Sequence, residues 1–128
     1  MNIFGIGIDI IEIKRIQKVF MYFGNYFAYK ILTKNELFIY KKSKNKIKIL
    51  SKYFTAKEAT VKALGTGFTN GICFNQIEIL NFKNNKPKII LYKHALNFLK
   101  NMNFKYKIHI SFSDEKKYAC TIVIIEKK

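Results

Sequence analysis

The chain has 128 residues, and its 24 Lys or Arg residues against 8 Asp or Glu residues give a formal net charge of +16 at pH 7. This length fits one domain, residues 1–128, and a hydrophobic share of 49% supplies a core without a disulfide or structural metal. No apolar run approaches the roughly 20 residues needed to cross a bilayer, so no membrane association is expected. With no leader-like segment at its start, we expect a soluble, cytoplasmic protein. Cys73 and Cys120 lie outside any Cys-x-x-Cys pair and are expected to be two buried thiols.

The first predicted element is a strand over residues 3–10. One of its faces carries only large apolar side chains, namely Phe4, Ile6, Ile8 and Ile10. The other face carries Gly5, Gly7 and Asp9. Glycine in a strand marks the close approach of a ligand or of another backbone. Two interpretations therefore remain open: Asp9 projects from a surface kept clear for a ligand, or the glycines pack tightly on a helix and Asp9 is a strand-end or capping residue.

Two helices are predicted next. The first covers residues 12–22, and its outer face is basic, with Lys14, Arg15 and Lys18. Such a face is usually only solvated, although it also suits an acidic partner. Residues 33–36, Thr-Lys-Asn-Glu, form a capping box that starts a second helix ending near residue 42. The lysines that follow, within residues 41–48, predict an exposed loop.

The longest helix is predicted over residues 47–64, with Gly65 as its C-terminal cap. Glu58 and Lys62 then stand one turn apart on one face. Lys57, Glu58 and Lys62 cannot all be buried without partners. If Asp9 joins them, two carboxylates and a lysine suit a hard divalent cation such as Mg²⁺, which takes oxygen ligands and is shared with substrate phosphates.

The C-terminal half is predicted to be mostly strands. Gly65, Gly67 and Gly71 make a turn-rich connector of the kind that lets backbone amides approach a ligand. The elements expected after it are a hairpin of strands 76–82 and 88–92 around a turn at 84–87, a helix 93–101, and strands 105–113 and 117–125. His109 and Ser111 share one strand face, where a histidine either faces a cleft or is merely exposed or hydrogen-bonded.

Several segments together resemble the holo-acyl-carrier-protein synthase family. They are Gly-Ile-Asp-Ile-Ile-Glu-Ile at residues 7–13, Phe-Thr-Ala-Lys-Glu-Ala-Thr-Val-Lys at 54–62, Gly-Thr-Gly at 65–67, His-Ile-Ser at 109–111 and the tail at 114–120. The resemblance covers nearly the whole chain. It implies an α+β phosphopantetheinyl transferase fold, with a small antiparallel sheet packed with a long central helix. It also implies a homotrimer with active sites at the subunit boundaries.

The activity that this resemblance implies is the transfer of the 4'-phosphopantetheine arm of coenzyme A onto a serine of apo acyl carrier protein, with release of adenosine 3',5'-bisphosphate. By the same likeness Asp9 and Glu58 bind Mg²⁺, while Lys62 contacts the phosphates and stabilises the leaving group. In-line attack on a phosphoryl group needs this positioning and charge neutralisation. The serine proton passes either to Glu58 or to a magnesium-bound water oriented by Asp9, and the sequence leaves both open.

Further contacts follow from the resemblance. Lys14, Arg15 and Lys18 match a basic surface that is offered to the acidic carrier, whose association would weaken with salt. The implied substrate-binding residues are Gly65, Gly67, His109, Ser111 and one lysine of residues 41–48, with Lys44 as the candidate for the 3'-phosphate. Because Arg15 is the sole arginine, these phosphate and partner contacts are expected to be less directional than those made by arginine.

The residues leave two other functions to consider. A small basic nucleic-acid-binding module would use Phe and Tyr among lysines as stacking platforms and would bind without magnesium, with a steep salt dependence. The sequence has no aromatic-rich recognition motif, and its lysine also reflects codon bias toward A and T, so nucleic acid is the weaker expectation. A carrier-binding subunit without catalysis would tolerate Glu58→Gln, whereas an enzyme would lose most of its turnover.

Overall fold

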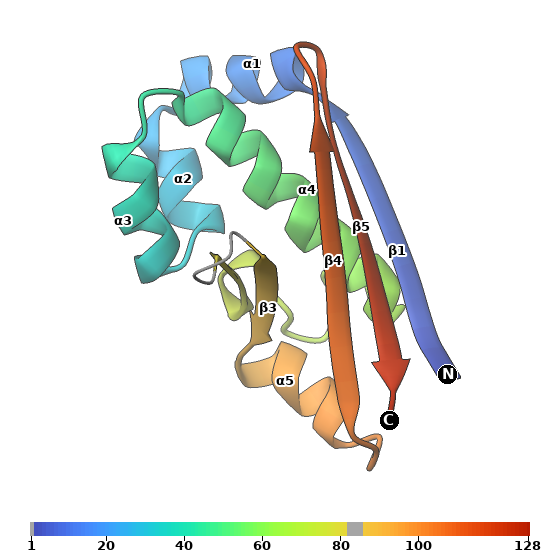
Figure 1. The fold of residues 1–128 in the computed structure, drawn as a ribbon. Coiled ribbons are helices and arrows are strands. Elements are labelled where there is room, and N and C mark those ends of the chain that lie inside the picture. Colours follow the sequence, from blue (N-terminus) through green and yellow to red (C-terminus); the bar gives the residue numbers. More distant parts are fainter. Residues whose placement is uncertain (1, 82–85) are drawn as a thin grey trace.

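The computed structural model describes residues 2–81 and 86–128. Their elements form a three-stranded sheet, a two-stranded hairpin and five α-helices (Figure 1). In chain order they are β1 (Asn2–Glu12), α1 (Ile13–Phe23), α2 (Asn25–Ile31), α3 (Lys34–Lys42), α4 (Lys46–Leu64), the 3-10 turn η1 (Phe74–Gln76), β2 (Ile77–Asn81), β3 (Pro87–Leu91), α5 (Lys93–Lys100), β4 (Tyr106–Asp114) and β5 (Tyr118–Lys127). The expected α+β class is therefore confirmed. The helix α2 was not predicted, and part of the turn expected at residues 84–87 lies outside the described residues.

The larger sheet has the strand order β1-β5-β4, and both of its pairings are antiparallel. In its register Asp9 is opposite Thr121, which is in turn opposite Phe112. The helix α4 runs along one side of this sheet, and Figure 1 shows α2 and α3 on the side of that helix away from the sheet, with α1 across the top of the view. The strands β2 and β3 form a separate hairpin whose β3 lies beside β4.

The glycine face of β1 packs directly on the backbone of α4. A Cβ atom built on Gly5 would lie 1.8 Å from the carbonyl oxygen of Ala63, and one built on Gly7 would lie 1.9 Å from that of Ala59. Any side chain at these two positions would therefore collide with the helix. The close-packing interpretation is correct for the glycines, because the space that they leave is filled by α4 and not by a ligand.

A buried ion pair ties α3, α4 and β2 together. The Lys57 ammonium, on α4, donates to a carboxylate oxygen of Glu36 at 2.5 Å and to the carbonyl of Ile31 at 2.6 Å, and both charged side chains are fully buried. Glu36 also closes the predicted capping box with Thr33 and accepts from the amide of Ile79 at 2.7 Å. Burial lowers the pKa of Lys57, and Glu36 opposes that shift. Lys57 thus has the partners that its burial requires.

Some local expectations were wrong. The lysine-rich stretch is not one loop, because α3 extends to Lys42 and α4 begins at Lys46, where Asn45 caps the helix by accepting from the amide of Lys48. The two thiols are not buried. Cys73 is exposed in the connector before η1, and Cys120 is half-buried, since it points away from α4 on the outer face of the sheet.

On the outer face of the large sheet, β1 and β5 present exposed apolar side chains. Ile6, Ile8 and Ile10 are 55%, 57% and 63% exposed, and Ile122 of β5 lies directly opposite Ile8. Phe4 does not share this face as predicted, because a bulge between Ile3 and Gly5 turns it against Phe104, with the ring centroids 5.3 Å apart. Within the described part of the chain, no helix is long and apolar enough to cross a membrane.

Candidate active site

Asp9 and Lys62 meet where β1 passes over α4. The Lys62 ammonium donates to a carboxylate oxygen of Asp9 at 3.1 Å and to the carbonyl oxygen of Ile8 at 3.0 Å. The Asp9 side chain is only 15% exposed, whereas that of Lys62 is 51% exposed. The strand thus fixes the carboxylate, and the lysine reaches it from the solvent side.

Glu58 completes this group from one turn earlier on α4. Its pKa is raised, first by burial and then by the negative charge of Asp9, and Lys62 acts in the opposite direction. Asp9 and Glu58 line one cavity of about 370 Å³, together with Arg15 and Phe54. The structure therefore brings together the three side chains that the sequence predicted would converge.

The donor set fits a metal ion for which the protein supplies only some of the ligands. Among residues 2–81 and 86–128, no cluster of three or more His, Cys, Asp or Glu side chains could hold a metal ion. Two carboxylates facing one cavity are what Mg²⁺ takes when substrate phosphates and water supply its remaining ligands. The residues present therefore fit Mg²⁺ shared with a phosphate substrate, and they do not fit a closed structural metal site.

The basic residues of α1 adjoin this cavity. Arg15 lines it, while Lys14 and Lys18 are exposed on the same helix. An acidic protein that docks on α1 would thus lie beside Asp9 and Glu58.

His109 and Ser111 are not brought to this group within one chain. Asp9 shares the α4-facing side of the sheet with Thr121, whose hydroxyl hydrogen-bonds the buried Thr55 of α4 at 2.8 Å. His109 and Ser111 pair with Ile124 and Ile122, which occupy the alternate positions of β5 and therefore the outer face. His109 instead contacts the Glu126 carboxylate at 3.1 Å.

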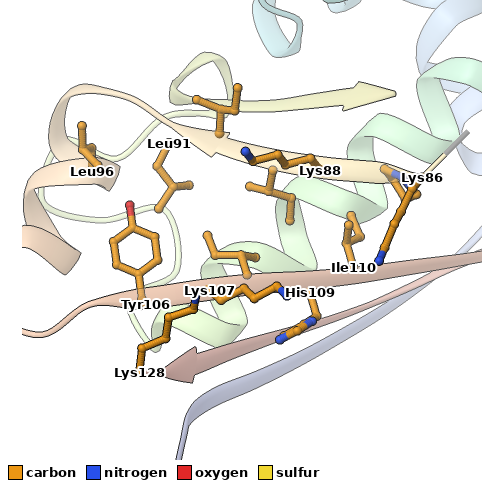
Figure 2. Close-up of a pocket in the computed structure, with 13 residues that line it drawn as sticks. Lys86, Lys88, Leu91, Leu96, Tyr106, Lys107, His109, Ile110 and Lys128 are labelled. Carbon is orange, nitrogen blue, oxygen red and sulfur yellow. The ribbon is translucent and has the colours of Figure 1, made fainter. Parts of the chain in front are cut away.

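A groove beside His109 was not anticipated from the sequence. It lies between β3 and β4, has a volume of about 1100 Å³, and combines lysines with an apolar lining of Leu91, Leu96, Tyr106 and Ile110 (Figure 2). The basic side chains around it are Lys86, Lys88, Lys107, His109 and Lys128. The sequence predicted Lys88, Lys107 and His109 within strands, but only the tertiary placement of β3 beside β4 gathers these residues around one groove.

The remaining predicted contacts are spread along α4. Gly65 caps its C-terminus in the left-handed conformation, with φ +80°, and Gly67 follows with φ +62°. Apart from the chain neighbours, no atom of the described residues lies within 4 Å of a Cβ built at either glycine, so backbone conformation rather than crowding requires them. Lys44 is exposed before the opposite end of the helix, which the helical rise puts roughly 20 Å from Glu58. The structure does not gather Lys44 with Asp9 and Glu58.

The fold and the site together define a small α+β protein in which two carboxylates and a lysine meet where β1 passes over α4. The sequence model of the 4'-phosphopantetheinyl transferase superfamily matches residues 5–123, and the chain belongs to this superfamily.

Relatives match over nearly their whole length. The holo-[acyl-carrier-protein] synthase of Buchnera aphidicola subsp. Schizaphis graminum is 51% identical over 127 residues, which are 99% of this chain and 100% of that protein. The crystal structure of holo-[acyl-carrier-protein] synthase from Neisseria meningitidis has a TM-score of 0.89 at 36% identity, covering 98% of this chain and 99% of that one. The Bacillus anthracis enzyme in complex with CoA (3',5'-ADP) has a TM-score of 0.83 at 34% identity, with full coverage of both chains.

Proposed function

We propose that this protein is a magnesium-dependent holo-acyl-carrier-protein synthase, which transfers 4'-phosphopantetheine from coenzyme A to a serine of apo acyl carrier protein. The observation that carries this proposal is that Asp9 and Glu58 line one cavity and that Lys62 forms an ion pair with Asp9. The relatives that bear this name, and the one solved with CoA (3',5'-ADP), support the substrates. Neither the fold nor the relatives support a nucleic-acid-binding module.

In the proposed reaction the serine oxygen forms a bond to the phosphorus of the phosphopantetheine arm as the bond from that phosphorus to the nucleotide phosphate breaks. Asp9 and Glu58 would hold Mg²⁺, which when bound supplies charge neutralisation to the pyrophosphate. Glu58 accepts the serine proton, a role that its raised pKa favours. Lys62 donates to the departing phosphate of adenosine 3',5'-bisphosphate, whose negative charge grows as the bond breaks.

The carrier is proposed to dock on α1. Lys14, Arg15 and Lys18 present positive charge next to the cavity, and opposite charges steer association. A serine on an acidic carrier seated there would lie close to Glu58. Lys62 and the backbone at Gly65 and Gly67 remain for the coenzyme on the other side of the site.

The assembly is proposed to be a homotrimer whose active sites lie at subunit boundaries. Ile6, Ile8, Ile10 and Ile122 form an exposed apolar patch of the kind that marks a protein interface. His109 and Ser111 lie on the same sheet face, so a neighbouring copy that covers the patch also meets these side chains. His109 and the groove of Figure 2, with Lys86 and Lys107, then supply substrate contacts to the neighbour's Asp9 and Glu58.

The deciding experiment is to incubate the protein with coenzyme A, Mg²⁺ and apo acyl carrier protein and to measure the mass of the carrier. We expect the carrier to gain one phosphopantetheine, and an unchanged mass would refute the proposal. Glu58→Gln should lose most of the turnover while keeping the circular dichroism spectrum. Glu115→Gln, the same change in the exposed β4–β5 turn, should keep both. Full turnover in Glu58→Gln would instead indicate that Glu58 plays no part in the reaction.

A further inference from the structure

The Lys62 ammonium occupies the place at Asp9 where a cation is needed. It donates to the Asp9 carboxylate and to the Ile8 carbonyl at once, so two oxygen atoms of β1 bind the same ammonium. We propose that Lys62 is a stand-in cation. It holds Asp9 in the absence of the divalent ion and competes with that ion, and it moves from Asp9 to the phosphates when the substrate binds. This inference rests on the proposed function, because it assumes a metal at Asp9 and Glu58.

The first step of the argument is electrostatic. Asp9 and Glu58 share a cavity, and the negative charge of Asp9 disfavours the ionised form of Glu58, so the two carboxylates repel each other. Lys62 supplies the positive charge nearest to this pair, at 3.1 Å from Asp9. The Lys62 ammonium thus holds Asp9 in position and offsets its repulsion with Glu58 before any ligand arrives.

The second step concerns exchange. An ion pair whose lysine is half exposed stabilises a protein only weakly, so Lys62 can leave Asp9 at little cost. A long, flexible lysine side chain can move from one oxygen anion to another. A divalent ion must displace this ammonium, whereas coenzyme A offers phosphates that draw it away. Metal affinity in the free protein is therefore reduced by Lys62.

A contrasting role predicts the opposite sign. If the contact merely fastened the end of β1 to α4, its loss would release Asp9 and weaken metal binding. If Lys62 competes with the metal, its loss strengthens metal binding, while the reaction itself slows because the leaving phosphate loses its donor. Affinity and turnover then move in opposite directions in one variant.

The test is titration of the full-length protein with Mn²⁺ alone, followed by the loss of the electron paramagnetic resonance signal of the free ion. We expect Lys62→Met to bind Mn²⁺ roughly three- to tenfold more tightly than the unsubstituted protein. Lys62→Arg keeps the positive charge and should bind like the unsubstituted protein. Lys48→Met removes an equal charge from another exposed lysine of α4, which pairs with Asp114 at 3.5 Å, and should change nothing.

Unchanged or weaker binding by Lys62→Met would overturn the inference, as would equal tightening in Lys48→Met. Thermal unfolding of each variant verifies that it is folded, which the exposure of both lysines favours. Asp9→Asn removes one carboxylate of the site, so its titration measures the Mn²⁺ that binds elsewhere on the protein. If neither the unsubstituted protein nor Lys62→Met binds more Mn²⁺ than Asp9→Asn, the stand-in role is refuted. The carrier mass then decides separately whether the proposed function fails with it.

Discussion

Gly7→Ala tests whether the close packing of β1 on α4 builds the active site. The new Cβ would lie 1.9 Å from the Ala59 carbonyl oxygen and 2.7 Å from the Ala63 amide nitrogen, whereas real Cβ atoms essentially never approach within 3.0 Å. The strand and the helix must therefore separate by about 1 Å, the difference between 3.0 and 1.9 Å. Because the obstacle is helix backbone, no change of rotamer relieves it.

Two consequences follow from that separation. Overpacking of this kind costs about 3 kcal/mol, which for a domain of this size lowers Tm by roughly 10 °C. Asp9 lies two residues further along the same strand, so it moves away from Glu58 and Lys62. A misplacement of about 1 Å in a catalytic constellation reduces turnover by roughly 100-fold.

Thermal unfolding followed by circular dichroism and the carrier mass assay measure these two effects. Gly24→Ala is the control, because it also forces alanine into a glycine conformation, with φ +57°. Its Cβ meets no atom of the described residues within 4 Å, apart from its chain neighbours. This variant should lose about 1–3 kcal/mol, the cost of its backbone conformation with ψ −138°, and keep its turnover. Adding Ala59→Gly should not rescue Gly7→Ala, since the collision is with the backbone of Ala59. Normal stability and turnover in Gly7→Ala, or rescue by Ala59→Gly, would contradict the reasoning.

Other substitutions probe the core and the docking surface. Lys57→Met leaves the Glu36 carboxylate buried without its cation and should lose about 3–5 kcal/mol in urea unfolding, part of which Glu36→Gln restores in the double variant. Burial raises the pKa of Tyr53 from 10.0 to about 12, so the folded state holds this proton more tightly than the unfolded state does. Stability should therefore fall as the pH rises from 10 to about 12, and less steeply in Tyr53→Phe. Replacing Lys14 and Lys18 by Glu should raise KM for the carrier and flatten its dependence on salt while leaving KM for coenzyme A unchanged; a uniform loss would contradict docking on α1.

Most elements could be predicted because their signals are local. The capping box at Thr33 and Glu36 and the glycine cap at Gly65 fixed the boundaries of α3 and α4 within a residue or two. The helix α2 escaped prediction because Gly24 separates it from α1 and its Tyr and Phe residues are modest helix formers. The lysines of residues 41–48 were assigned to a loop from their charge, although lysine is also a good helix former.

Within the site, the outcome depended on how far apart the interacting elements lie in sequence. Glu58 and Lys62 could be paired from helical spacing alone. Asp9 joined them through the family resemblance, because its position after the glycines left two interpretations open. The face of β4 that carries His109 could not be related to Asp9, since that relation needs the register of two separate strand pairings, β1 with β5 and β5 with β4. A shift of one residue in either pairing would have moved His109 to the other face.

The spacing of the contacts explains why the glycines and the acidic residues occur together. Gly5 packs on Ala63 and Gly7 on Ala59. These two contacts form a seam between β1 and α4, along which the strand and the helix run in opposite directions. Two strand residues span roughly 6.6 Å and four helix residues span roughly 6 Å, so the two repeats stay in step. Extending the seam by one repeat puts Asp9 level with Thr55, next to the turn that carries Glu58. Glu58 and Lys62 each precede one of the two alanines, which sets both on the flank of the seam. The site is therefore an extension of the core packing, and a change that shifts the seam must also shift the distance between its two carboxylates.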